Sequence, residues 1–319
     1  MENKKLYNLH PDWISGFTQA DGCFNISFKN TKGFLPRARF IISQHIKDEK
    51  LILSIKYYFN CGIIIKSRKQ IQFIVNSIDD LFNIILPHFN KYPLKSGKYI
   101  SYKLFEEIII LMKNKEHLNN IGLKKIIKLA YNMNPLGIRK ISIEELLSKL
   151  NLTKADLYID NINNYYLYHI DNLSPWFIGG LIQGDGYFNI SFKNTGICYI
   201  RLIIVQDIYS KDLLYELLKY FSSGTIIDCK VNMYKYTNMN SNNIDNYIIP
   251  ILSLDNILFL DKKKQFNIFK EINNLIINKK HLSKEEKLKI IKLAYNMNFL
   301  GKKRKLSKEE FINKIFPKF

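Results

Sequence analysis

Cysteine is scarce in this chain of 319 residues, and the four that occur show no metal-binding pattern. Cys23, Cys61, Cys198 and Cys229 have neither CxxC spacing nor a histidine nearby in the sequence. A small protein stapled by disulfides is therefore excluded, and a zinc site and a disulfide framework are both poor interpretations. We predict that all four are reduced thiols with structural roles.

Long apolar runs are absent as well. No stretch approaches the roughly 18 residues that a membrane-spanning helix needs. The amino-terminal sequence MENKKLYNLH lacks the apolar core of a signal peptide. We therefore expect a soluble protein without a membrane partner.

Alanine and arginine are rare, with 5 and 6 residues, whereas lysine and asparagine number 42 and 34. The rare pair has GC-rich codons and the abundant pair AT-rich codons, so the composition predicts an AT-rich genome. An organellar genome, for example, fits this bias. For the same reason, the abundance of asparagine carries no argument about function.

Acidic residues are few relative to basic ones. The 28 Asp and Glu stand against 48 Lys and Arg, which leaves a net charge of +20 and a pI near 9.5. Such a surface attracts polyanions, and nucleic acid is the first candidate partner. At about 150 residues per domain, the length indicates two domains.

An internal repeat accounts for both domains. When the chain is aligned with itself so that Trp13 meets Phe177, Trp13 to Thr31 match Phe177 to Thr195 at 13 of 19 positions. At the same offset, Phe105 to Gly137 match Phe269 to Gly301 at 20 of 33 positions. A single offset at both ends means that each half is a complete folding unit with little net insertion.

The boundaries follow from these blocks: a first repeat at 1–140, a linker at 141–173 and a second repeat at 174–319. The linker begins with a helical pattern and then becomes rich in Asn and Tyr. Each repeat opens with a proline at the first helical position, Pro11 or Pro175, where its missing N–H costs nothing. We expect a helix of about ten residues after each proline.

Behind each opening helix the apolar pattern changes from helical to alternating. A first strand follows each Asp-Gly pair, and further strands are expected at Arg37–Ser43, Ile63–Lys66, Gln70–Val75, Tyr199–Val205, Thr225–Lys230 and about Val231–Tyr236. Helices are expected at Asp48–Phe59, Tyr99–Met112, Gly122–Asn132 and their counterparts in the second half. Each half is therefore an α+β unit with an antiparallel sheet.

Both opening helices end at an Asp-Gly pair, and we expect Gly22 and Gly186 to take the left-handed conformation that ends many helices. Small residues recur within these helices and let two helix backbones approach closely. They are Gly16, Ala20, Gly180 and Gly184, with Ser15 and Gly179 beside them. We expect the two helices to pack side by side and to bring Asp21 and Asp185 together.

Two carboxylates at the C-terminal ends of two helices are unfavourable, by ~0.3 to 1 kcal/mol for each acid. A divalent cation that prefers oxygen ligands, Mg²⁺ above all, would compensate. A single Asp-Gly pair would indicate only a turn, because that dipeptide is common in turns. Two copies on glycine-striped helices, in a protein of net charge +20, favour a metal site.

The motifs ISGFTQADG (Ile14 to Gly22) and IGGLIQGDG (Ile178 to Gly186) resemble those of the LAGLIDADG homing endonucleases of the single-chain, two-repeat type. The likeness covers nearly the whole chain outside the linker. It implies two αββαββα repeats, whose four-stranded antiparallel sheets form a saddle over DNA, with the motif helices at the domain interface. It also implies a monomer that cuts double-stranded DNA.

The resemblance assigns roles to individual positions. Asp21 and Asp185 match the metal-binding acids of the family, which implies a divalent metal, Mg²⁺, as cofactor. Further catalytic positions that order the attacking water and neutralise charge are matched by Gln44, Gln206, Lys98 and Lys262. Lysines in such sequences are otherwise ordinary surface charges. The earlier acid of the family motif is replaced by Gln19 and Gln183, at a position usually read as structural.

The solvent-facing strand residues are expected to bind DNA, because polar and basic side chains recur there at strand spacing. The candidates are Asn25, Ser27, Lys29, Arg37, Arg39, Lys66, Arg68, Gln70, Gln72, Asn189, Ser191, Lys193, Arg201, Lys230, Asn232 and Tyr234. Four of the six arginines lie in or beside these strands. A merely solvated basic face explains the charge but not this concentration.

Together with these features, the resemblance implies a site-specific homing endonuclease that makes a metal-dependent double-strand break. We expect it to be encoded in an organellar intron, that of a fungal mitochondrion. Because the motif helices nearly match between repeats while the DNA-facing strands differ, we expect a long, weakly palindromic target. Two alternatives remain open: a maturase that binds its host intron RNA, and a non-catalytic, sequence-specific DNA-binding regulator on the same fold. The intact Asp21 and Asp185 favour the nuclease.

Overall fold

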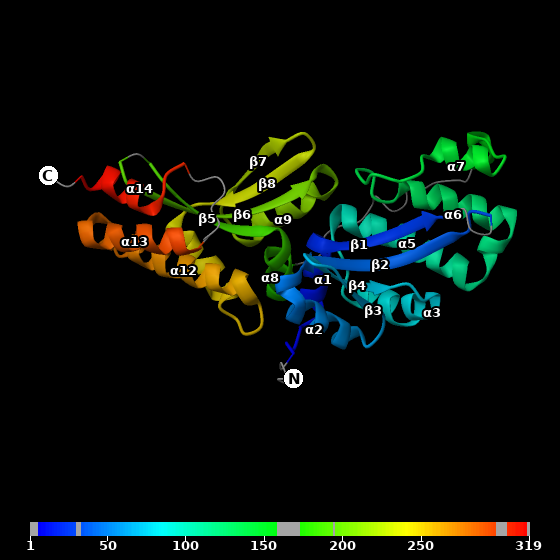
Figure 1. Cartoon of the computed structure of the whole chain (residues 1–319), viewed down its shortest axis with the longest axis horizontal. Helices are drawn as coiled ribbons and strands as arrows, with labels where there is room; N and C mark the ends of the chain where they lie inside the picture. Colours follow the sequence, from blue (N-terminus) through cyan, green and yellow to red (C-terminus); the bar gives the residue numbers. More distant parts are fainter. Residues whose placement is uncertain (1–5, 30–32, 158–172, 194, 298–304, 318–319) are drawn as a thin grey trace. The chain divides into compact units, whose positions relative to one another are not determined.

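The computed structural model describes residues 6–29, 33–157, 173–193, 195–297 and 305–317. The chain divides into two compact units, Met1–Asn172 and Leu173–Phe319, which share one order of elements (Figure 1). No helix within the described ranges is long and apolar enough to cross a membrane.

The first unit is a four-stranded antiparallel sheet with helices against one face. Its strands are β1 (Gly22–Phe28), β2 (Pro36–His45), β3 (Ile63–Lys66) and β4 (Gln70–Val75), in the order β1-β2-β4-β3. Its helices are α1 (Pro11–Asp21), α2 (Glu49–Phe59), α3 (Ile78–Asp80), α4 (Leu86–Lys91), α5 (Ser96–Lys113), α6 (Asn120–Asn132) and α7 (Ile143–Lys149). Helices α2 and α5 contact the sheet.

The second unit repeats this arrangement. Its strands are β5 (Gly186–Phe192), β6 (Cys198–Asp207), β7 (Thr225–Lys230) and β8 (Met233–Asn238), in the order β5-β6-β8-β7. Its helices are α8 (Pro175–Asp185), α9 (Lys211–Tyr220), α10 (Ser241–Asn243), α11 (Ile249–Leu252), α12 (Leu260–Ile277), α13 (Lys284–Met297) and α14 (Lys308–Ile315). The prediction of two α+β repeats with four-stranded antiparallel sheets is confirmed.

In each unit a short helix that is capped by a serine follows α6 or α13. Ser142 Oγ accepts a hydrogen bond from the Glu145 N–H at 3.1 Å before α7, and Ser307 Oγ accepts one from the Glu310 N–H at 3.2 Å before α14. Helix α7 lies in the segment that the sequence assigned to the linker. Residues 158–172, the Asn- and Tyr-rich part of that segment, lie outside the described residues.

The core of the first unit is an aromatic cluster that the alternation of β1 builds. Phe24, Ile26 and Phe28 are buried on one face of the strand. The Phe24 ring lies 5.1 to 5.5 Å from four further aromatic rings, those of Phe40, Phe89, Tyr102 and Phe105. The helices cover this face of the sheet, and the opposite face carries most of the polar side chains of β1 and β2 together with exposed isoleucines such as Ile63 and Ile65.

The four cysteines are free thiols. Burial raises the pKa of Cys198 to about 12, and burial, with Asp80 nearby, raises that of Cys61 to about 11. Since the thiolate is the reactive form, these two side chains are inert at neutral pH.

A buried histidine joins the motif helix of the first unit to its neighbours. Ser15 Oγ of α1 lies 3.3 Å from His88 Nε2, and the Tyr58 hydroxyl lies 3.1 Å from His88 Nδ1. Burial lowers the pKa of His88 to about 3. The imidazole is therefore neutral at physiological pH and serves as a hydrogen-bonding part of the core.

We expect this histidine to make the first unit sensitive to acid. The unfolded chain binds a proton at His88 near pH 6.5, whereas the folded chain does not bind it above about pH 3, so stability falls as the pH drops below 6.5. The loss is about 1.4 kcal/mol per pH unit at most. Urea unfolding at pH 7.5 and 5.0 should show a flatter pH dependence for His88→Gln than for the wild type.

Candidate functional site

Both motif helices run directly into a strand. Asp21 is the last residue of α1 and Gly22 the first of β1, and Asp185 and Gly186 stand likewise at α8 and β5. The prediction of left-handed glycines is wrong, because their φ and ψ are −81° and 148°, and −82° and 147°. Space is what requires glycine: a Cβ on Gly22 would lie 2.7 Å from the backbone oxygen of Thr18.

The small residues beside the predicted helix stripe serve contacts within their own units. Ser15 Oγ donates a hydrogen bond to the backbone oxygen of Tyr92 at 2.7 Å. A Cβ on Gly179 would lie 2.2 Å from Ile257 Cγ1. The side-by-side packing of α1 and α8 stays a prediction.

A glutamine holds each acid. Gln44 Nε2 donates to Asp21 Oδ2 at 2.6 Å, and Gln206 Nε2 donates to Asp185 Oδ2 at the same distance. Both glutamines lie on the core side of their strands, near the end where the strand leaves the core. A hydrogen bond to an ionised carboxylate is short and strong, so it orients the acid.

A lysine completes the cluster in each unit. Lys98 Nζ, from the first turn of α5, donates to the backbone oxygen of Gly22 at 2.7 Å. Lys262 Nζ of α12 donates in the same way to Gly186. The residues that the sequence predicted as Asp, Gln and Lys of one site therefore lie together in each unit, and their catalytic roles stay predictions.

The glutamines that replace the family's earlier acid fix the start of the lysine helices. Gln19 Oε1 accepts from the Lys95 N–H at 2.9 Å, and Gln183 Oε1 accepts from the Phe259 N–H at 2.9 Å. The next residue in each case, Ser96 or Leu260, has a positive φ of 49° or 52°. Such strained backbone persists only where its surroundings hold it, and nothing in the sequence signals it.

The oxygen atoms at each acid are suitable ligands for a hard divalent cation. Mg²⁺ is usually bound through one or two carboxylates, with waters and substrate phosphates completing its coordination. The carboxylates of Asp21 and Asp185 and the adjoining backbone oxygens are the oxygen ligands that such ions prefer. Among the described residues no group of three or more His, Cys, Asp and Glu could hold a metal. Metal binding by these acids stays a prediction.

We expect Gln44→Met or Gln206→Met to slow cleavage about 10- to 100-fold, the usual effect of losing a residue that orients a metal ligand. The hydrogen bond at 2.6 Å is lost while the volume is kept. Cleavage measured across a Mg²⁺ titration should need more metal for half-maximal rate, with DNA affinity unchanged. Normal cleavage at limiting metal would contradict the assigned role.

Strand register places most of the predicted DNA-binding residues on the open face of each sheet. In the first unit Asn25 pairs with Arg39, and Ser27 with Arg37. The same faces carry Gln70, Gln72, Asn189, Ser191, Arg201 and Lys230. Beside the strands lie Lys29, Arg68, Lys193 and Asn232. Contact of these side chains with DNA stays a prediction.

The predicted placement of Lys66 on the open face is wrong. Lys66 pairs with the fully buried Ile71, so it belongs to the helix-covered face, where its ammonium forms an ion pair with Glu49 of α2. Ile65, with 47% of its surface exposed, takes the open position instead. A four-residue strand offers too little alternation to fix which side chains face out.

Tyr234 is also on the other face from the one predicted. It pairs with Gln206 of the core face, and Lys235 occupies the open face. The predicted strand began at about Val231, but the chain turns at Asn232, with a φ of 60°, and β8 begins only at Met233. Lys230 and Met233 pair across the turn of Val231 and Asn232, so alternation counted from Lys230 through that turn assigns Tyr234 to the wrong face.

Comparison with known proteins gives one consistent result. The profile of the LAGLIDADG endonuclease family matches residues 14–109 and 178–273. A probable intron-encoded DNA endonuclease 1 of Mycosarcoma maydis is 28% identical over 256 residues, which cover 77% of this chain and 93% of that protein. A probable intron-encoded endonuclease 2 of Neurospora crassa is 33% identical over 303 residues, which cover 91% of this chain but 65% of that protein.

A solved structure agrees with these sequence matches. The structure of I-SmaMI bound to uncleaved DNA target in the presence of calcium ions superimposes with a TM-score of 0.79 and 27% identity. The match covers 91% of this chain and 99% of that one. Both the fold of each unit and the order of its elements therefore have a DNA-bound counterpart.

Proposed function

This chain belongs to the LAGLIDADG endonuclease family, and from that premise we propose that it is a site-specific, metal-dependent DNA endonuclease that makes a double-strand break. The observation that carries the proposal is the recurrence of one Asp, Gln and Lys cluster at the end of each motif helix. A regulator that only binds DNA has no use for two such clusters.

The metal in this proposal is Mg²⁺, held by Asp21 and Asp185. When bound, a divalent ion polarises the scissile phosphate and offsets the charge on the leaving 3′ oxygen. Gln44 and Gln206 would keep each carboxylate in position. With one acid in each cluster, each cluster would cleave one of the two DNA strands.

The two lysines would act on charge and water. Lys98 and Lys262 lie at the backbone oxygens of the glycines next to the acids. From there an ammonium would stabilise the negative charge that develops on the phosphate during in-line attack by water. The ammonium would also help to order that water.

We further propose that residues 1–140 and 174–319 each read one half of the target. The open sheet faces that would read the two halves differ. Arg39 has no hydrogen-bonding partner for its Nε among the described residues, whereas Arg201 donates to Asn189 and Ser191. Arg39→Ala should therefore cost about 1 to 3 kcal/mol for base pairs in one half-site alone, and Arg201→Ala for base pairs in the other. Selection from a randomised duplex pool checks this, and a perfect palindrome would contradict it.

The gene is proposed to lie in a mitochondrial intron of a fungus. The bias toward residues with AT-rich codons supports this, as do two similar fungal proteins that are intron-encoded.

The proposed function is tested with a plasmid that carries the joined exon sequence from both sides of the reading frame. It should be linearised at one site with Mg²⁺ and left intact with EDTA, and specific binding without any cleavage would favour the regulator.

A further inference from the structure

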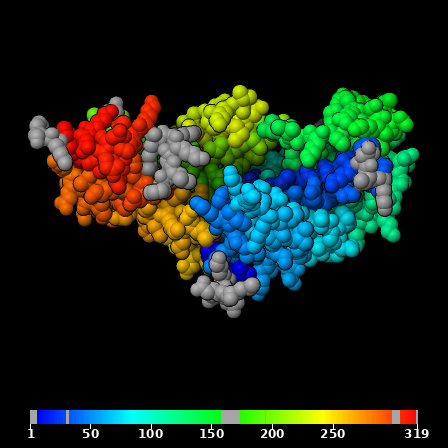
Figure 2. Space-filling model, in the orientation of Figure 1, coloured from blue at the N-terminus to red at the C-terminus, as the bar shows by residue number. Residues whose placement is uncertain are grey.

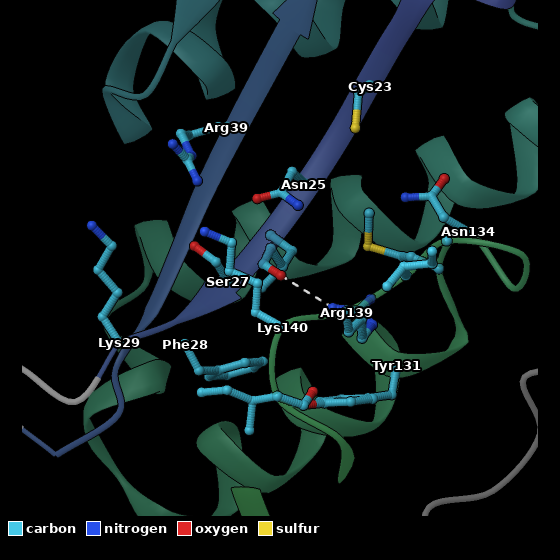
Figure 3. Close-up of a pocket in the computed structure, with 15 residues that line it drawn as sticks. Cys23, Asn25, Ser27, Phe28, Lys29, Arg39, Tyr131, Asn134, Arg139 and Lys140 are labelled. Carbon is cyan, nitrogen blue, oxygen red and sulfur yellow. Dashed lines mark hydrogen bonds between the residues drawn. The ribbon is translucent and has the colours of Figure 1, made fainter.

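A pocket of about 420 Å³ lies beside β1 on the open face of the first unit (Figure 3). One side is formed by side chains of β1 and β2, among them Asn25, Ser27 and Arg39. The other side is formed by residues that follow α6, from Met133 to Ile141. This second wall lies outside the sheet.

The pocket is lined by cations. Lys29, Arg39, Arg139 and Lys140 contribute to its walls, and no Asp or Glu of the described ranges does. Four positive charges without a counter-charge in these walls favour an anionic ligand.

Three buried polar atoms of the pocket have no hydrogen-bonding partner in the described part of the chain. They are Asn25 Oδ1, Ser27 Oγ and Arg39 Nε. In the second unit the corresponding Asn and Ser side chains accept hydrogen bonds from Arg201 at 3.2 and 3.3 Å. Because buried polar atoms rarely stay unsatisfied, the two donors among them, the Ser27 hydroxyl and Arg39 Nε, are open to contacts with a ligand in the first unit. In the second unit Arg201 already satisfies the corresponding Asn and Ser.

The second wall is fixed to the edge of the sheet. Arg139 Nη1 donates to the backbone oxygen of Ile26 at 3.2 Å, and Arg139 Nη2 donates to that of Ala130. The Arg139 guanidinium lies 4.5 Å from the centre of the Tyr131 ring. Asn134 Nδ2 donates to the backbone oxygen of Phe24 in β1 at 3.0 Å. These bonds hold the exposed Lys140 beside the open face.

In the space-filling view of Figure 2, blue residues of the β1 and β2 region lie beside green residues of the α7 region. The segment 134–140 leads from α6 to α7 along that edge. A duplex on the open face would thus meet this segment as well as the strands.

We propose that this pocket binds a phosphate of the DNA backbone, so that the segment 134–140 is part of the DNA interface. Phosphate oxygens can accept hydrogen bonds from the Ser27 hydroxyl and the Lys140 ammonium, which leaves Arg39 to read base pairs as proposed above. The inference rests on the proposed function and adds a contact from outside the two sheets.

The test is the salt dependence of binding for Lys140→Ala. A lysine that neutralises one phosphate contributes about 0.9 to the slope of log affinity against log salt concentration. Affinity of the full chain for a duplex recovered by selection should therefore fall with a slope shallower by about 0.9 than in the wild type. The effect should be equal for duplexes of different sequence, because a phosphate contact reads no bases.

Lys154→Ala is the matched control, since Lys154 follows α7, is 70% exposed and pairs with Glu144 at 2.7 Å. Its slope should equal that of the wild type. An unchanged slope for Lys140→Ala, or an equal fall for Lys154→Ala, would overturn the inference and leave the proposed function intact. If the wild type itself bound no duplex, the proposed function would fail instead.

Discussion

Replacing Asp21 or Asp185 by asparagine is expected to abolish double-strand cleavage while DNA affinity stays within a few fold. The amide keeps the shape of the carboxylate and its contact with Gln44 or Gln206, but loses the negative charge that holds a divalent cation. Losing one source of transition-state charge stabilisation costs about 10²- to 10³-fold in rate. Plasmid linearisation and a binding titration in Ca²⁺ would measure the two effects separately.

Exposed acids provide the controls for this experiment. Asp79 and Asp255 lie on the surface, one in each unit, and Asp79 pairs with Lys113. Since exposed ion pairs contribute little, Asp79→Asn and Asp255→Asn should cut at the wild-type rate. Cleavage at that rate by Asp21→Asn or Asp185→Asn would remove the basis of the mechanism. A fall in cleavage rate that is fully explained by weaker DNA binding would also contradict the mechanism.

The cluster around each acid was predictable because most of it recurs in the repeat. The offset that aligns Asp21 with Asp185 also aligns Lys98 with Lys262. It aligns Gln44 with Ile208, two positions beyond Gln206, so the repeat alone does not match the glutamines. Resemblance to a known family supplied that pair, and the hydrogen bonds to the acids support it.

The faces of the outer strands were harder to predict. Lys66 and Tyr234 are suitable DNA-binding residues by type, and both lie on the helix-covered face. Alternation gives the spacing of side chains but not the residue at which a strand begins. The turn at Asn232 decided the second case, and a left-handed Asn is a signal that the sequence offers only weakly.

The starts of helices α7 and α14 are marked by a signal in the sequence. Ser142 stands three positions before Glu145, and Ser307 three before Glu310, the spacing of a helix start. The common offset aligns Ser142 with Leu306 rather than with Ser307, so the two helix starts are out of step by one position. Few identities flank them, so the helical pattern after Ser142 was assigned to the linker rather than to the first repeat.

Gly22→Ala and Gly186→Ala are expected to damage cleavage more than any other change that leaves the clusters' own side chains untouched. A Cβ would lie 2.4 Å from Thr18 Cγ2 at Gly22, and 2.7 Å from Ile182 Cα at Gly186. The helix end must shift to relieve the overlap, at a cost of about 1 to 3 kcal/mol in stability. The acid is the preceding residue and moves with it, and a displacement near 1 Å can cost about 10²-fold in rate.

Gly33→Ala separates this effect from a general loss of stability. Gly33 has a φ of 76° and no atom within 4 Å of an added Cβ, so alanine there is strained only by its backbone, at about 1 to 2 kcal/mol. Unfolding curves should therefore shift for all three variants, whereas the cleavage rate of the folded fraction should fall only for Gly22→Ala and Gly186→Ala. Gly22 and Gly186 directly follow the acids, and their backbone oxygens accept the hydrogen bonds of Lys98 and Lys262. Equal rates in the three variants would therefore mean that cleavage tolerates movement of the acid. The clusters would then not be the catalytic centres.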